Sequence, residues 1–293
     1  MGVLQTLARL VALSRRPALL AAFIWVLSRI RAALQRPQIT FGRHLRRPGA
    51  HPSGRLVTLS HGLTHFIVDG AENGGPLVVL VHGFVGSTGY LAPLAEYLAA
   101  RGGRRVLRLD LYGRGFSECR GAPQTADLFA GQIAELLFAL GETSPVDLCG
   151  YSMGGGIVAR FASCFPERIR SLTIVAGIGM PSMRSALPPY LALALRVPML
   201  RDLVGIVVTE GAKDDHKLVS AWTDHTSQRC KEQVALQRER MMNEPAVARS
   251  ATNSLSHMAW GELRGEFEKI AKGSFPVLVI WGDADATVPV TVR

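Results

Sequence analysis

Paired cysteines are the first thing that this sequence lacks. The four cysteines, Cys119, Cys149, Cys164 and Cys230, are scattered among 293 residues without a paired spacing. This pattern excludes a disulfide framework and a cysteine-based zinc site. We interpret the four as reduced thiols that pack as small apolar side chains. Because no other group of residues suggests a metal or an organic cofactor, we expect neither.

Acidic residues are missing from the N-terminal end. None occurs before Asp69, whereas the same stretch contains ten arginines. The chain has 33 basic and 23 acidic residues, a net charge of +10, so the whole excess belongs to this end and the rest is neutral. The neutral part also lacks a basic stripe with interleaved aromatic residues, which argues against binding to nucleic acid.

The N-terminal arm and linker, residues 1–54, lack an apolar run that is long enough for a conventional transmembrane helix. The uncharged core from Ala18 to Ser28 is about half the length that a spanning helix needs. An arginine-rich, acid-free arm fits a mitochondrial transit peptide, and equally an interfacial helix on an anionic membrane or a weak secretory signal. Gly2 and Thr6 also match the myristoylation pattern, and a plain amphipathic helix packed on the domain is the simplest alternative. We expect a mitochondrial or membrane-associated protein, and otherwise a cytoplasmic one.

Strand-like and helix-like segments alternate along residues 55–177. The pattern predicts strands at 56–60, 64–69, 77–81, 105–110, 146–150 and 170–177, and helices at 90–101, 125–140 and 153–165. Such alternation predicts βαβ units, and therefore an α/β fold with a mostly parallel central sheet and helices on both faces. The first two strands are expected to form a hairpin. Helix-like, proline-containing sequence then fills residues 178–272, and a strand-like run resumes within 273–293.

A serine lies between glycines at the junction of a predicted strand and a predicted helix. The sequence Gly150-Tyr151-Ser152-Met153-Gly154 fits the G-x-S-x-G nucleophile elbow, a turn so sharp that flanking side chains would clash. Such a turn holds a serine hydroxyl above the carboxyl end of the sheet. The helix that follows offers free N–H groups to a developing oxyanion.

Two loops are expected at the same edge of the sheet. The segment HGFVGS, residues 82–87, follows a predicted strand, and we predict the N–H groups of Phe84 and Met153 as oxyanion donors. His82 and Tyr151 are candidates for substrate contact, although anchoring of the loop is favoured over a role as a base for His82. The segment DLYGRGFS, residues 110–117, predicts a tight turn beside this loop.

A carboxylate follows the last strand-like run. The segment WGDADATVP, residues 281–289, contains Asp283 and Asp285. We predict that Asp285 orients a catalytic histidine, with Asp283 as the reserve.

Together, HGF, DLYGRGFS, GYSMGG and GDADATVP, in this order, resemble the α/β-hydrolase superfamily, specifically the serine hydrolases with a helical cap. The resemblance covers roughly residues 60–293. It implies a core formed by residues 55–177 and 273–293, with residues 178–272 as the cap. It also implies that Ser152 is the nucleophile, that Asp285 is the triad acid, and that carboxylic esters are cleaved through an acyl-enzyme. A serine nucleophile argues against dehalogenase or epoxide hydrolase chemistry.

A histidine after Asp285 is what the family pattern requires and this sequence lacks. The family triad runs serine, acid, histidine along the chain, and no histidine occurs from Ala286 to Arg293. His216, His225 and His257 in the cap segment are weak substitutes, of which His257 is the best. We therefore expect a chain that is cut short, without the last strand and helix, and with an exposed apolar edge from Val277 to Trp281.

The cap segment gives the only indication of a substrate. Residues 186–208 are strongly apolar, which favours a hydrophobic or lipid-like ester, although packing within the cap explains them equally well. Residues 228–240 alternate in charge and predict a solvated helix face. Two other functions stay open: a binding protein that kept the elbow and lost its base, and a membrane-recruited partner in which the arm has the main role.

Overall fold

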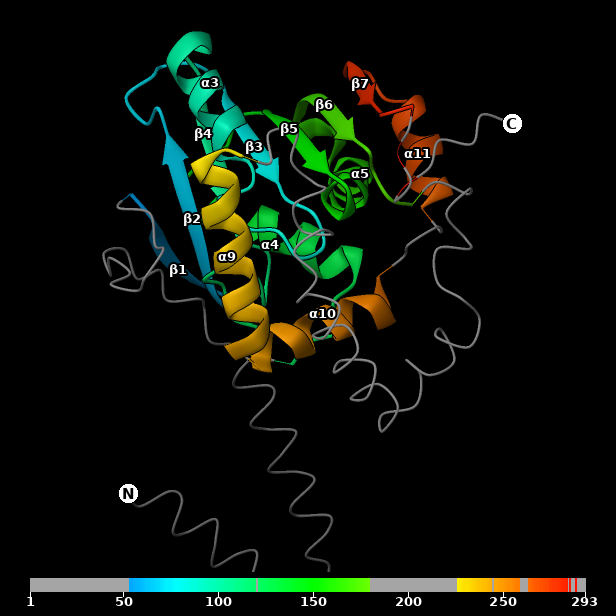
Figure 1. The fold of residues 1–293 in the computed structure, drawn as a ribbon. Helices are drawn as coiled ribbons and strands as arrows, with labels where there is room; N and C mark the ends of the chain where they lie inside the picture. Colours follow the sequence, from blue (N-terminus) through cyan, green and yellow to red (C-terminus); the bar gives the residue numbers. More distant parts are fainter. Residues whose placement is uncertain are drawn as a thin grey trace, which may run out of the picture. The chain divides into compact units, whose positions relative to one another are not determined.

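The computed structural model describes residues 53–119, 121–179, 226–243, 245–258, 263–283, 285 and 288. Within these ranges the chain forms one seven-stranded sheet with helices packed against it (Figure 1). Most of the arm, the apolar segment 186–208, His216 and His225 lie outside the described residues, so the expectations that concern them stay predictions. No helix in the described ranges is both long and apolar enough to cross a membrane.

The sheet is antiparallel at one edge and parallel elsewhere, which confirms the predicted fold class. Its strand order is β1-β2-β4-β3-β5-β6-β7. The strands are β1 (Arg55–Leu59), β2 (Gly62–Asp69), β3 (Leu77–Val81), β4 (Arg105–Leu109), β5 (Val146–Tyr151), β6 (Ile169–Val175) and β7 (Val277–Ile280). β1 and β2 form the predicted hairpin, and β2 also runs antiparallel to β4. All other neighbours pair in parallel.

Helices cover both faces of the sheet. The helices of the described residues are α3 (Ala92–Gly102), α4 (Ala126–Ala139), α5 (Met153–Cys164), α9 (Gln228–Asn243), α10 (Pro245–His257) and α11 (Arg264–Ala271), with a short 3₁₀ turn at Pro166–Arg168. β3 shows the two faces best, because all five of its residues are buried. Val79 and Val81 face the large core with α4 and α5, whereas Val78 and Leu80 face a smaller core with Ala95 of α3. A strand buried on both sides therefore reads as a continuous apolar run.

Helix α11 corrects the predicted boundary of the cap at residue 272. This helix packs on α5, with Leu263 and Ile270 in the large core and Glu266 paired with Arg160 at 2.7 Å. The N–H of Leu263 also donates to the carbonyl of Gly179. The segment from Leu263 onward is therefore part of the core. Its helical pattern resembles that of the preceding helices, and only its packing partner distinguishes it.

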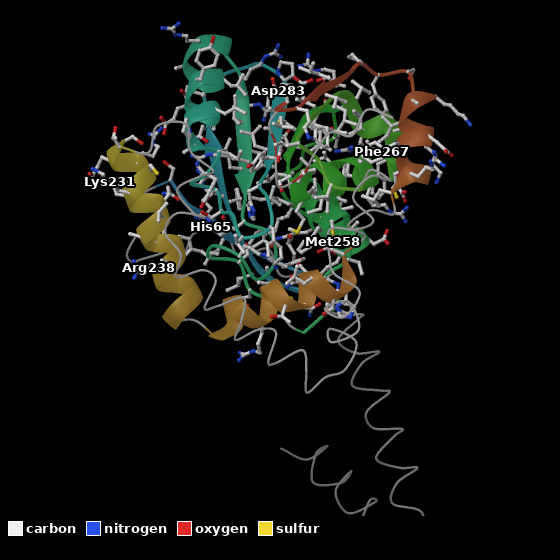
Figure 2. The ribbon with its side chains drawn as sticks, turned by 45° about the vertical axis from the view of Figure 1, so that its right-hand side comes forward. His65, Lys231, Arg238, Met258, Phe267 and Asp283 are labelled. Atoms are coloured by element: carbon white, nitrogen blue, oxygen red, sulfur yellow. The ribbon has the colours of Figure 1, made fainter. Side chains whose placement is uncertain are left out.

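Helix α9 has the solvated, charged face that its sequence predicts. Lys231 and Arg238 are exposed and point outward in Figure 2, whereas Cys230 and Val234 are buried. Arg229 joins this helix to α3, with its Nη2 atom 2.9 Å from both carboxylate oxygens of Glu96.

Strand β7 presents an apolar surface, as expected. It is the last strand in the sheet order, and its residues Val277, Leu278, Val279 and Ile280 are 42–55% exposed.

Candidate active site

Ser152 lies in the turn between β5 and α5 with an unusual backbone conformation. Its φ is 56° and its ψ is −119°, a combination that costs a side-chain-bearing residue about 1–3 kcal/mol. Three hydrogen bonds hold it there. Its N–H donates to the Val175 carbonyl at 2.9 Å, and its carbonyl accepts from Gly155 at 2.9 Å and Ile178 at 3.1 Å. The turn is thus fastened to β6 and to the first turn of α5.

Glycines on both sides of Ser152 allow close contact between backbones. A Cβ atom on Gly150 would lie 2.3 Å from the carbonyl oxygen of Gly154, and one on Gly154 would lie 2.3 Å from that of Val81. Neither approach leaves room for a methyl group. The start of α5 consequently rests directly against the end of β3.

The loop after β3 lies beside Ser152. A Cβ atom on Gly83 would be 3.2 Å from Ser152 Cβ and 3.5 Å from its Oγ atom. Phe84 is the next residue in this loop. Met153 is the first residue of α5, so its N–H has no acceptor within the helix. The structure therefore brings Ser152, Met153 and the Phe84 loop together at the carboxyl end of the sheet.

His82 anchors this loop. Its fully buried ring has Nδ1 2.8 Å from the Gly83 carbonyl oxygen, and its Nε2 accepts the N–H of Leu111 at 3.0 Å. These partners assign the proton to Nδ1. Burial lowers the pKa of His82 to about 4, although the charge of Asp110 opposes this shift. Both ring nitrogens are engaged, which corrects the expectation that His82 contacts substrate.

The hydrogen bond from His82 also orients a predicted oxyanion donor. The Gly83 carbonyl and the Phe84 N–H belong to one planar peptide unit and point in opposite directions, because the peptide is trans. Fixing the carbonyl toward His82 therefore fixes the direction of the Phe84 N–H.

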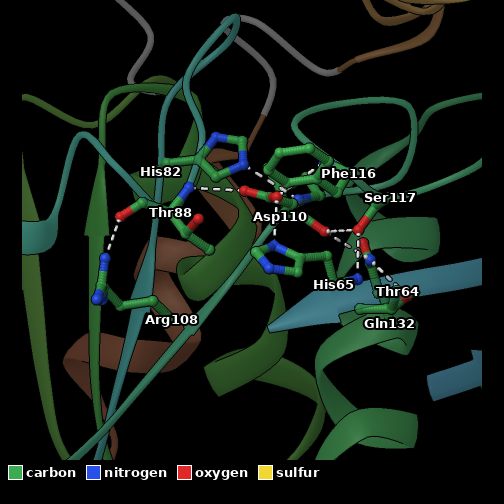
Figure 3. A network of polar contacts seen from close by, with 10 residues as sticks. Thr64, His65, His82, Thr88, Arg108, Asp110, Phe116, Ser117 and Gln132 are labelled. Carbon is green, nitrogen blue, oxygen red and sulfur yellow. Dashed lines mark hydrogen bonds and ion pairs between the residues drawn. The ribbon is translucent and has the colours of Figure 1, made fainter. Parts of the chain in front are cut away.

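Asp110 is the centre of a buried polar network that sequence reasoning missed (Figure 3). Its carboxylate accepts the N–H groups of Thr88 at 2.6 Å and Phe116 at 2.9 Å, and pairs with His65 Nδ1 at 2.7 Å. Burial alone would raise the pKa of Asp110, but the hydrogen bond and charge of His65 outweigh it and lower the pKa to about 2. The signal was present, since Asp110 begins the DLYGRGFS segment directly after a strand.

Arg108 binds the carbonyl of Thr88, whose N–H is bound by Asp110. This buried side chain donates from Nη1 to the Thr88 carbonyl at 2.7 Å, and binds both oxygens of Asp69 at 2.7 and 2.9 Å. Asp110 and Arg108 thus clamp Thr88 from two sides (Figure 3). With His82 at the start and Thr88 at the end, the loop of residues 82–88 is anchored at both termini.

The pair of His65 and Asp110 looks like a catalytic dyad but lies away from Ser152. His65 is on β2, and strands β4 and β3 separate β2 from β5, a distance of about 14 Å at the usual strand spacing. The ring is 1% exposed and packs edge-on against Phe116 at 5.1 Å. Its Nε2 atom has no hydrogen-bond partner in the described part of the chain. We interpret the pair as structural.

Asp285 lies near the Ser152 turn. Tyr151, Val175 and Ile280 form one row across β5, β6 and β7, so the segment after β7 leaves the sheet at the level of Ser152. Burial raises the pKa of Tyr151, and the negative charge of Asp285 raises it further, which places this carboxylate within electrostatic reach of the residue before Ser152.

The two aspartates after β7 differ in their surroundings. Asp285 is half-buried and accepts the Val288 N–H at 2.8 Å, whereas Asp283 is exposed.

The four described histidines all have other contacts. His82 and His65 are engaged as above, His61 packs edge-on against Tyr112, and Nδ1 of His257 donates to the Asn253 carbonyl within α10. A histidine that serves Ser152 would therefore come from outside the described residues. Within those residues, no group of three histidine, cysteine or carboxylate side chains is arranged to hold a metal ion.

Comparison with known proteins agrees with this geometry. The family described as the alpha/beta hydrolase fold matches residues 76–293. The chain is 31% identical over 225 residues to the dihydrolipoyllysine-residue acetyltransferase component of an acetoin cleaving system from Pseudomonas putida, with 75% of this chain and 54% of that protein covered. It is 27% identical over 237 residues to Lipase 3 of Moraxella sp. (strain TA144), covering 80% and 70%.

A solved membrane phospholipase A, described as a novel bacterial virulence factor, shares the fold. The TM-score is 0.60 at 24% identity, and the match covers 99% of this chain and 83% of that one. Strand order, the Ser152 turn and the family match over residues 76–293 all lead to one assignment: the chain belongs to the alpha/beta hydrolase fold family.

Proposed function

We propose that this protein is a serine hydrolase that cleaves carboxylic esters through an acyl-enzyme on Ser152. The observation that carries the proposal is the position of Ser152, at φ 56° in the β5–α5 turn and against Gly83 of the anchored loop. In this proposal the Ser152 hydroxyl is the nucleophile, and the N–H groups of Phe84 and Met153 stabilise the oxyanion.

In the proposed reaction, Ser152 Oγ attacks the ester carbonyl and loses its proton to a histidine. The N–H groups of Phe84 and Met153 donate to the oxyanion of the tetrahedral intermediate. The intermediate collapses with return of that proton to the leaving alcohol, and water then releases the acid by the same steps. Asp285 orients the histidine, which lies outside the described residues.

We also propose a hydrophobic or lipid-like ester as the substrate and a membrane surface as a contact of the arm. The first proposal rests on the apolar sequence of residues 186–208 and on similarity to a lipase. The second rests on the ten arginines and the absence of acids before Asp69. Initial rates on p-nitrophenyl esters of increasing acyl length test the substrate: a rising kcat/KM is expected, and a falling one contradicts the proposal.

Labelling of the full chain with a fluorophosphonate probe tests the nucleophile. We expect a labelled protein, loss of the label in Ser152→Ala, and retention in Ser163→Ala, whose hydroxyl bonds the Arg160 carbonyl in the same helix. For the acid, Asp285→Asn is expected to slow labelling by roughly 10²–10⁴-fold, and the exposed Asp283→Asn to leave it unchanged. An unlabelled full chain contradicts catalysis and favours a binding role.

A further inference from the structure

Arg114 is a fully buried cation that contacts both the Phe84 loop and the cap. Its side chain is 2% exposed. Nε donates to the Phe84 carbonyl at 2.9 Å, and Nη2 donates to Ser254 Oγ in α10 at 2.8 Å. Nη1 donates to Ser250 Oγ, one turn earlier in α10, at 2.6 Å. One planar guanidinium therefore bridges a core loop and a cap helix, and Ser254 in that helix is 140 residues from Arg114 along the chain.

The surroundings of Arg114 fix its position without a carboxylate in any described contact. Nη1 also bonds the side-chain oxygen of Gln124, and the ring of Phe84 lies 5.6 Å from the guanidinium carbon. Gln124 completes the bridge, because its Nε2 donates to Ser250 Oγ at 2.5 Å and its Oε1 accepts from Ser254 Oγ at 2.6 Å. Burial lowers the pKa of Arg114 to about 9, so the group stays charged at neutral pH and keeps all its donors.

The contact with Phe84 bears directly on the proposed oxyanion hole. His82 holds the peptide unit before the Phe84 Cα atom through the Gly83 carbonyl, and Arg114 holds the unit after it through the Phe84 carbonyl. With both peptide planes fixed, the backbone angles of Phe84 are set and so is the direction of its N–H. Within the described residues, Arg114 is the anchor of the two that also bonds the cap helix α10.

We propose that Arg114 is a positioning residue that couples the docking of cap helix α10 to the orientation of the Phe84 N–H. The proposal rests on the proposed function, since it assigns that N–H to the oxyanion. Ser250 and Ser254 hold the guanidinium at the angle at which Nε reaches the Phe84 carbonyl. When α10 moves away, the guanidinium loses these partners and Nε no longer has a fixed position from which to donate to the Phe84 carbonyl. The Phe84 N–H then loses its fixed direction toward the oxyanion.

The test compares Ser254→Ala with Ser256→Ala in the full chain. Both remove one hydroxyl from α10, but the Ser256 hydroxyl donates to the Thr252 carbonyl of its own helix at 2.9 Å. Hydrogen exchange of peptides from residues 82–88 reads out the loop without any need for activity. The rate of Ser152 labelling by a fluorophosphonate reads out the oxyanion hole.

We expect Ser254→Ala to speed exchange in residues 82–88 and to slow labelling, each by about tenfold, and Ser256→Ala to change neither. Arg114→Lys keeps the charge but loses the planar fork, and should slow labelling by about 10²-fold. Unchanged exchange in a folded Ser254→Ala protein overturns the coupling, whether or not Arg114→Lys folds. If the unsubstituted protein is never labelled, the proposed function fails, and the exchange comparison still decides the coupling.

Discussion

Ser152 combines the side chain proposed as nucleophile with a strained backbone, and the two can be separated by substitution. At φ 56° and ψ −119°, glycine is favoured over any residue that has a Cβ atom. We expect Ser152→Gly to raise the free energy of unfolding by about 1 kcal/mol, since relief of strain exceeds the added entropy of the unfolded chain. Ser152→Ala keeps the Cβ atom and should leave stability nearly unchanged. Urea denaturation measures both, and a glycine variant less stable than the alanine variant would contradict the strain.

His82 should make stability depend on pH in a defined window. Its pKa is lowered from 6.5 to about 4 in the folded protein, so between these values the unfolded chain binds more protons and stability falls as the pH falls. The loss from pH 6.5 to 4 should approach about 3 kcal/mol. The pKa of Asp110 is lowered from 3.8 to about 2. Its carboxylate therefore stabilises the fold at pH values above 3.8, and this contribution is lost as the pH falls from 3.8 to about 2.

Substitution of His82 tests this assignment. Urea denaturation of His82→Gln from pH 4 to 7 should show lower stability at pH 7 but a flatter dependence on pH. His257→Gln, at a half-buried position in α10, should keep the dependence of the unsubstituted protein. A slope that survives in His82→Gln would show that other groups cause it.

At the scale of elements, the contact between α5 and the end of β3 depends on Gly154. A Cβ atom there would lie 2.3 Å from the Val81 carbonyl oxygen and 2.7 Å from that of His82, and two backbone segments cannot yield as a side chain can. We expect Gly154→Ala to destabilise the protein by about 3 kcal/mol and to abolish labelling of Ser152. Urea denaturation measures the first effect and the fluorophosphonate probe the second.

Gly131 in α4 provides the matched control. A Cβ atom there meets nothing within 4 Å, so Gly131→Ala should stabilise the protein by about 0.5–1 kcal/mol through helix propensity. If both alanine variants gain stability, the close packing of α5 on β3 is not what requires glycine.

The elements themselves were predictable to within about two residues, because each is bordered by glycine, proline or polar sequence. The run Leu77–Val81 was predicted and found as β3. The helix predicted at 90–101 begins instead at Ala92, where Pro93 suits a first helical turn. The cap boundary predicted at residue 272 did not anticipate that α11 packs on α5, since an amphipathic pattern shows which face of a helix is buried but not which element covers it.

At the scale of the whole molecule, we expect the basic arm to bind anionic membranes and the neutral core not to bind them. All of the net charge of +10 lies before Asp69, and each arginine near an anionic membrane contributes about 1 kcal/mol. We expect the full chain to sediment with vesicles that contain phosphatidylserine, and a chain without residues 1–54 to stay in the supernatant. Binding should weaken as salt is raised. Equal sedimentation of the shortened chain would place the membrane contact in the core.

The sequence by itself determined the fold class, the order of the elements and the position of Ser152 in a sharp turn between a strand and a helix. These follow from local properties: buried strands need continuous apolar runs, and the turn at residue 152 needs glycines at fixed spacing. Tertiary structure alone decided which polar groups hold the loop of residues 82–88. Asp110, Arg108 and Arg114 reach Thr88 and Phe84 across strands and loops that are 20–30 residues away in the chain. A buried hydrogen bond of this kind requires that two groups distant in the sequence lie close together in the fold, and local sequence patterns do not predict such contacts.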